Sequence, residues 1–188
     1  MEKIKKLVGD ILELDAGFRS LAEREDLDGR LAYAVERSAQ GIKGVVKAHA
    51  TAAKMPKGVQ KFNEERLTLA RSHARKDAAG SPVLHKNTFV FDDPEEFESL
   101  VAKLREKYSA DLEAWEKRME TLESEMETKE EEVELHLTTP ATFPTKLSPL
   151  QLRALIALTP KATKEEWDAY FDRCDKAGKD KKKKPAED

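Results

Sequence analysis

The fold of this chain is decided by residues 59–97, which read VQKFNEERLTLARSHARKDAAGSPVLHKNTFVFDDPEEF. Apolar residues spaced three and four apart predict a helix over 58–76, and the turn around Gly80 ends it. Two short extended segments follow, 82–85 and 88–91, separated by two residues that suit a tight turn. The stretch therefore predicts a helix leading into a small β-hairpin.

A second helix, predicted over 94–128, follows the hairpin. Asp93 is a favourable N-cap, Pro94 suits the first helical position, and the glutamates after it complement the positive helix end. Apolar side chains then recur at coiled-coil spacing, and we call this set the seam. The seam consists of Phe97, Val101, Leu104, Tyr108, Leu112, Trp115, Met119, Leu122 and Met126. It predicts self-association or a partner helix, with packing on the 27–46 helix of the same chain as the alternative.

The remaining pattern predicts a mainly α protein with a small β-sheet, an α+β fold. Further helices are expected at 2–14, 24–55, 149–158 and 163–177. Residues 133–138 alternate apolar and polar side chains with period two, which predicts a strand. Because an isolated two-stranded hairpin is marginal in water, we expect this strand to join the hairpin in a three-stranded sheet.

The same pattern suggests four regions along the chain. They are an N-terminal helical region at 1–57, a helix–hairpin–helix–strand core at 58–139, a C-terminal helical pair at 140–178 and a Lys-rich tail at 179–188. Composition predicts that the tail is disordered, because it contains almost nothing that could be buried.

Composition excludes several classes of protein. Of 188 residues, 38% are charged and 6% aromatic, and the net charge of -3 gives no global attraction to nucleic acid or anionic membrane. The single cysteine, Cys174, excludes an intramolecular disulfide and suits a reducing compartment. Apolar residues near the N-terminus are spaced rather than continuous, so we expect no signal peptide, no membrane span and a cytoplasmic location.

Four blocks of the middle region resemble a family of small bacteriophage and prophage proteins. The blocks are Phe62 to Leu67, Asp77 to Pro82, Phe89 to Phe97 and Glu132 to Leu135. The family has largely no assigned activity, so the resemblance implies a phage origin rather than a mechanism. The helix–hairpin–helix order is also similar in layout to prefoldin-type chaperone subunits, which is an analogy of architecture alone.

Individual motifs give weaker signals. The sequence Gly41-Ile42-Lys43-Gly44 matches the GxxG loop of KH-type RNA-binding domains, but the helical apolar period passes through it. His49, His73, His85 and His136 lack metal-binding spacing, although the last two would meet if the predicted three-stranded sheet formed. No nucleophile elbow, Walker A loop or dinucleotide fingerprint occurs, so we expect a protein without catalytic residues, metal or cofactor.

Basic residues gather in two places and could contact phosphates. They are Lys54, Lys57, Lys61, Arg66, Arg71, Arg75 and Lys76 in the middle region, and Lys181, Lys182, Lys183 and Lys184 in the tail. The alternative is that they keep the protein soluble and pair with the acidic run Glu123–Glu132.

Together these features predict a non-enzymatic, phage-type interaction protein. It would bind a host or phage macromolecule, either as an accessory or assembly factor or as an inhibitor of a host defence system. Two alternatives remain open: a nucleic-acid-binding protein that uses the basic residues, and a sponge that sequesters a small nucleotide signal.

Overall fold

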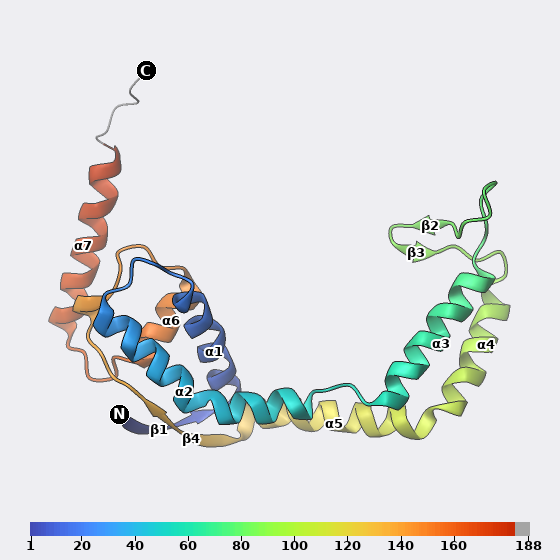
Figure 1. Ribbon diagram of the computed structural model, residues 1–188, viewed down its shortest axis with the longest axis horizontal. Helices are drawn as coiled ribbons and strands as arrows, with labels where there is room; N and C mark the ends of the chain where they lie inside the picture. The colour runs from blue at the N-terminus through green and yellow to red at the C-terminus, as the bar shows by residue number, and fades with distance from the viewer. Residues whose placement is uncertain (183–188) are drawn as a thin grey trace. The chain divides into compact units, whose positions relative to one another are not determined.

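The computed structural model describes residues 1–182, and these form two units (Figure 1). Unit 1 contains Met1–Ala52 together with the described residues from Glu123 onward, and unit 2 contains Ala53–Leu122. The fold is mainly helical with two small two-stranded sheets, which confirms the predicted α+β class. The division differs from the boundaries predicted at 57/58 and 139/140, because a strand from each of the two segments of unit 1 pairs with the other.

Those strands are β1, Glu2–Leu7, and β4, Glu130–Leu135, which pair antiparallel with Ile4 opposite Val133. The predicted helix over 2–14 is therefore wrong in its first half, and the predicted three-stranded sheet is wrong as well. Charge explains the pairing, because a lysine-rich strand lies against a glutamate-rich one. The amine of Lys3 lies 2.8 Å from a carboxylate oxygen of Glu132.

The helices of unit 1 are α1, Val8–Ala22; α2, Gly29–Ala52; α6, Pro149–Ala157; and α7, Lys164–Lys182, with the short 3-10 helix η1, Pro140–Thr142. Both C-terminal helices begin where the sequence predicted. Ser148 and Gln151 form a reciprocal capping box at α6, and Thr163 and Glu166 form the same arrangement at α7. Helix α7 includes the first four residues of the predicted tail, and residues 183–188 lie outside the described residues.

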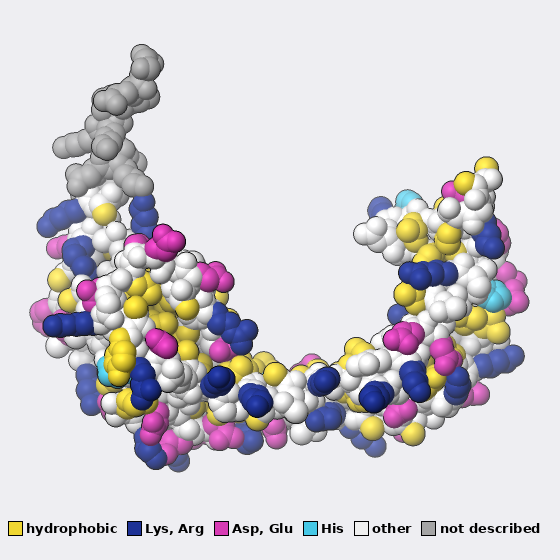
Figure 2. Space-filling model, in the orientation of Figure 1, with side chains coloured by type: hydrophobic (Ala, Val, Ile, Leu, Met, Phe, Trp, Pro, Cys, Tyr) yellow, Lys and Arg dark blue, Asp and Glu magenta, His cyan; other side chains and the backbone are white. Residues whose placement is uncertain are grey.

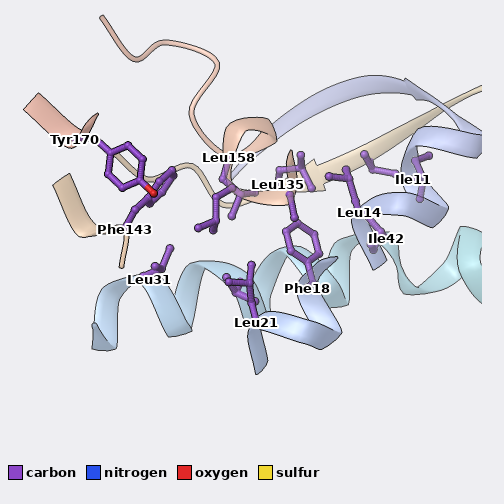
Figure 3. Packing of buried hydrophobic residues seen from close by; sticks show 14 residues of the cluster. Ile11, Leu14, Phe18, Leu21, Leu31, Ile42, Leu135, Phe143, Leu158 and Tyr170 are labelled. Atoms are coloured by element: carbon purple, nitrogen blue, oxygen red, sulfur yellow. The ribbon is translucent and has the colours of Figure 1, made fainter. Parts of the chain in front are cut away.

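A single hydrophobic core fills unit 1 (Figure 3). Its side chains come from α1, α2, β4, α6 and α7 and from the residues that follow η1 and α6. They include Ile11, Leu14, Phe18, Leu21, Leu31, Ile42, Leu135, Phe143, Leu155, Leu158 and Tyr170. Helix α2 approaches β4 closely because Gly41 has no side chain: a Cβ there would overlap the Glu134 carbonyl oxygen. Burial raises the pKa of the Tyr170 phenol to about 12, and its hydroxyl donates to the Pro144 carbonyl at 3.2 Å.

Unit 2 consists of α3, Lys57–His73; the hairpin strands β2, Leu84–His85, and β3, Thr88–Phe89; α4, Pro94–Lys107; and most of α5, Ser109–Thr128. The predicted N-cap is present, since an Asp93 oxygen accepts from the Glu96 amide at 2.9 Å. Helices α3 and α4 pack against each other and lie side by side (Figure 1).

The predicted helix over 94–128 is not continuous. It breaks at Tyr108, whose backbone leaves helical geometry at φ -112° and ψ 14°. Neither proline nor glycine lies at the break. Instead, side chains of Lys107 and Tyr108 both bind Glu65 on α3, so a tertiary contact fixes the bend.

Candidate functional site

The seam lies on α4 and α5, and the structure leaves it partly covered. Helix α4 has no fully buried residue, and the seam side chains from Phe97 to Met119 are all half-buried. Leu122, at 6% exposure, is the first of them to be buried. The seam is therefore an apolar stripe with free surface along its edges.

The first half of the seam packs on its own chain. The ring of Phe97 stacks on Phe91 at a centroid distance of 4.1 Å, and Tyr108 meets Phe62 edge-on at 6.1 Å. Within unit 2 the seam thus packs on α3 and on the segment that leads into α4. The 27–46 helix, proposed above as an intramolecular partner, uses Leu31, Ala34, Val35, Ser38 and Ile42 in the core of unit 1. Self-association through the seam stays a prediction.

A polar clamp holds the bend between α4 and α5. The carboxylate of Glu65 accepts from the Lys107 amine at 2.8 and 3.0 Å and from the Tyr108 hydroxyl at 2.6 Å. These two donors lower the pKa of Glu65, and bonding to Glu65 raises the pKa of Lys107 and of Tyr108. On the other flank of the bend, Arg105 lies 3.3 Å from Glu116.

The hairpin carries the most exposed large apolar side chain of unit 2. Leu84 in β2 is 55% exposed, and its cross-strand partner is Phe89. The turn places Lys86 at φ 48° and Asn87 at φ 66°, both in the left-handed region. Asparagine tolerates that region, but lysine is strained there. The two-residue turn fits the type I′ geometry that favours tight hairpins.

The basic residues of the middle region are exposed, and most lack an ionic partner. Within the described part of the chain, Lys54, Lys57, Lys61 and Arg71 form no ion pair, whereas Arg75 binds Asp92 at 2.5 Å. None of them binds the acidic run. That run instead pairs with Lys3 and with Lys129 among the described residues. The side chains of Lys181 to Lys184 lie outside the described residues.

A further concave surface lies between α1 and α2 in unit 1 and was missed by the sequence analysis. Two adjoining cavities of about 330 and 490 Å³ share Arg19, Glu36 and Ala39. We call this the α1–α2 groove. The one signal that could have indicated it is the row of small residues Ala32, Ala39 and Ala50 on one side of α2.

The positions of the weaker motifs in the structure decide between their alternative interpretations. Gly41 and Gly44 lie inside α2, as the helical apolar period indicated, so the GxxG match is not a KH-type loop. His85 belongs to β2 and His136 follows β4, so the predicted sheet that would have joined them does not exist. Among residues 1–182 no three His, Cys, Asp or Glu side chains are grouped as metal ligands. Cys174 is half-buried on α7 beside Tyr170.

No helix in the described residues has the length and hydrophobicity that crossing a bilayer requires. No protein family matches the chain, and comparisons with curated proteins and with solved structures likewise gave no significant match.

Proposed function

We propose that this protein is a non-enzymatic interaction protein that binds a host or phage macromolecule through unit 2. We call α3, the β2–β3 hairpin and α4 the arm. The observation that carries the proposal is the hairpin, which presents Leu84 at 55% exposure on a strained two-residue turn. Backbone strain and exposed apolar side chains persist where a binding role favours them.

The rest of the arm supports this reading. Leu67 on α3 is 44% exposed, and the seam on α4 is only half-buried. An arm of two helices and a short hairpin has little interior of its own, so a partner that covers these side chains would add apolar burial at roughly 25 cal/mol per Å². The phage-like blocks of the sequence fall largely within the arm, which favours a phage accessory factor or an inhibitor of host defence as its role.

Affinity capture from phage-infected cells tests this proposal. A tagged wild-type chain and Leu84→Asp are compared with Leu150→Asp, which changes a 37% exposed leucine on α6 of unit 1. We expect Leu84→Asp to lose the captured partner and Leu150→Asp to retain it. Equal capture by all three proteins would show that the arm is not the binding surface.

The unpaired cations favour nucleic acid as a second candidate partner. Lys57 and Lys61 lie one helical turn apart on α3, and neither forms a salt bridge among the described residues, although Lys61 helps to lower the pKa of Glu65. If this surface binds DNA or RNA, affinity should fall steeply between low and moderate salt. Lys57→Glu with Lys61→Glu, and deletion of 179–184, should each weaken binding. Binding that is independent of salt would exclude this candidate.

A further inference from the structure

The α1–α2 groove has the length and lining of a binding surface for a helix. Helix α2 contributes side chains to it from Ala32 to Ala50, which corresponds to about 27 Å of helix. Its lining residues on α2 recur at helical spacing and α1 supplies the opposite wall. The apolar ones are Phe18, Ala22, Leu27, Ala32, Val35, Ala39, Val46 and Ala50.

The floor of this groove is already formed in the isolated chain. Phe18 is 1% exposed and Val35 is 2% exposed, and both belong to the core of unit 1. Alanine at positions 32, 39 and 50 keeps the walls low, which lets the backbone of an incoming helix come close. Figure 2 shows hydrophobic side chains between α1 and α2 with charged side chains around them.

The charged side chains along the rim of the groove indicate whether an acidic or a basic ligand would bind there. Arg19 is bound to Asp15 at 2.5 Å, and Arg24 is held by Asp26 at 2.7 Å. By contrast, Lys43 and Lys47 are exposed and form no ion pair within residues 1–182. At this end of the groove the two lysines without an ion pair outnumber the one such carboxylate, Glu36, so the net charge is positive.

We propose that the α1–α2 groove binds an acidic amphipathic helix of a partner protein. Apolar side chains of that helix at i, i+3 or i+4, and i+7 fill the two cavities, as in other helix-in-groove complexes. Its carboxylates lie beside Lys43 and Lys47. This surface belongs to unit 1 and does not depend on the arm, so the two proposals can fail separately.

Fluorescence anisotropy with a labelled peptide tests the proposal. The probe is a synthetic peptide of residues 109–128, which has seven acidic and two basic residues and an apolar stripe. A scrambled peptide of the same composition is the control. We expect the full chain to bind the probe at least about tenfold more tightly than the scrambled peptide, a difference of about 1.4 kcal/mol.

Two variants locate the binding on the groove. Ala39→Trp fills the point where the cavities join, and Lys43→Glu with Lys47→Glu reverses the rim charge without touching the core. Each should raise the Kd about tenfold or more, whereas Ala48→Trp, on an exposed position of the same helix outside the groove, should leave it unchanged.

Three outcomes would overturn the proposal. The first is equal binding of probe and scrambled peptide. The second is wild-type binding by the Lys43→Glu, Lys47→Glu variant at an unchanged melting temperature. The third is a wild-type dimer whose mass halves in Ala39→Trp, because the occupant would then be a second copy of this chain.

Discussion

Unit 1 and unit 2 are both mainly helical, but they differ greatly in how many hydrophobic residues they bury. Unit 2 has five buried hydrophobic residues, and two of them are alanines: Val59, Phe62, Ala70, Ala74 and Leu122. All other buried hydrophobic residues lie in unit 1. Since burial of apolar surface is the main favourable term in folding, unit 1 should hold most of the stability of the chain.

Unit 2 therefore depends more than unit 1 on ring stacking, helix caps and surface polar contacts. Such regions open locally at a lower free energy than a packed core does. The two units should therefore respond differently to matched substitutions, and the following predictions test that difference in order of decreasing effect.

The largest difference is expected between two leucines. Leu155→Ala removes a side chain at 0% exposure from unit 1 and should lower the free energy of unfolding by about 2–5 kcal/mol. Leu104→Ala changes a half-buried leucine in unit 2 and should cost clearly less. Denaturant unfolding followed by circular dichroism measures both. Equal losses would mean that the two interiors are equivalent.

Two glycines of α2 form the next pair. Gly41→Ala places a methyl group against the Glu134 carbonyl oxygen and should destabilise unit 1 by about 1–3 kcal/mol. Gly44→Ala meets nothing within 4 Å and should stabilise the helix by up to about 1 kcal/mol. Thermal melts of the two variants should shift in opposite directions. A shift in the same direction would contradict the close approach of α2 to β4.

Substitutions in the seam test whether unit 2 covers its half-buried apolar side chains by binding a second copy of the chain. We expect the wild-type chain to have a mass above 21.2 kDa in light scattering, and Leu104→Ala with Met119→Ala to shift it toward the monomer while helix content is kept. The double change should cost about 1–2 kcal/mol, since both side chains are half-buried. A monomeric mass for both proteins, with a lower melting temperature for the variant, would place the seam contacts within one chain.

The hairpin turn should be improved by glycine. Lys86→Gly removes the strain of a left-handed lysine at φ 48° and should stabilise unit 2 by about 1 kcal/mol. Slower hydrogen exchange of the β2 and β3 backbone amides in Lys86→Gly than in wild type would show this stabilisation. Lys54→Gly, at an exposed position between α2 and α3, is a control for the loss of a lysine. Faster exchange in Lys86→Gly would mean that its side chain supports the hairpin.

The smallest expected effect concerns the Glu65 clamp and pH. Its two donors lower the pKa of Glu65, so the clamp stabilises the fold above the ordinary glutamate pKa of about 4.3 and is lost as pH falls through the lowered value. Glu65→Gln should be slightly less stable than wild type at pH 7, and the gap should close as pH falls from the ordinary glutamate pKa of about 4.3 through the lowered pKa of Glu65. Melting temperatures across this range measure the gap. A constant difference would show that the charge of Glu65 is not what matters.

The sequence by itself determined the elements whose signals are local. The helices that follow Asp93, Ser148 and Thr163 begin close to the predicted positions, because each of these side chains accepts a hydrogen bond from the backbone amide three residues ahead. The turn at Lys86-Asn87 likewise follows from two residues and the strands beside them. The mainly helical class comes from such short-range periodicity.

The tertiary structure alone decided which distant segments meet. Residues 2–7 carry a helical apolar spacing, yet they form β1 because the glutamate-rich β4, which is distant in sequence, supplies hydrogen bonds and opposite charge. The helix over 94–128 bends at Tyr108 because Glu65 binds there. The α1–α2 groove exists only after two helices pack. In each case the structure depends on a contact with a segment that is distant in sequence, so the local sequence pattern could not predict it.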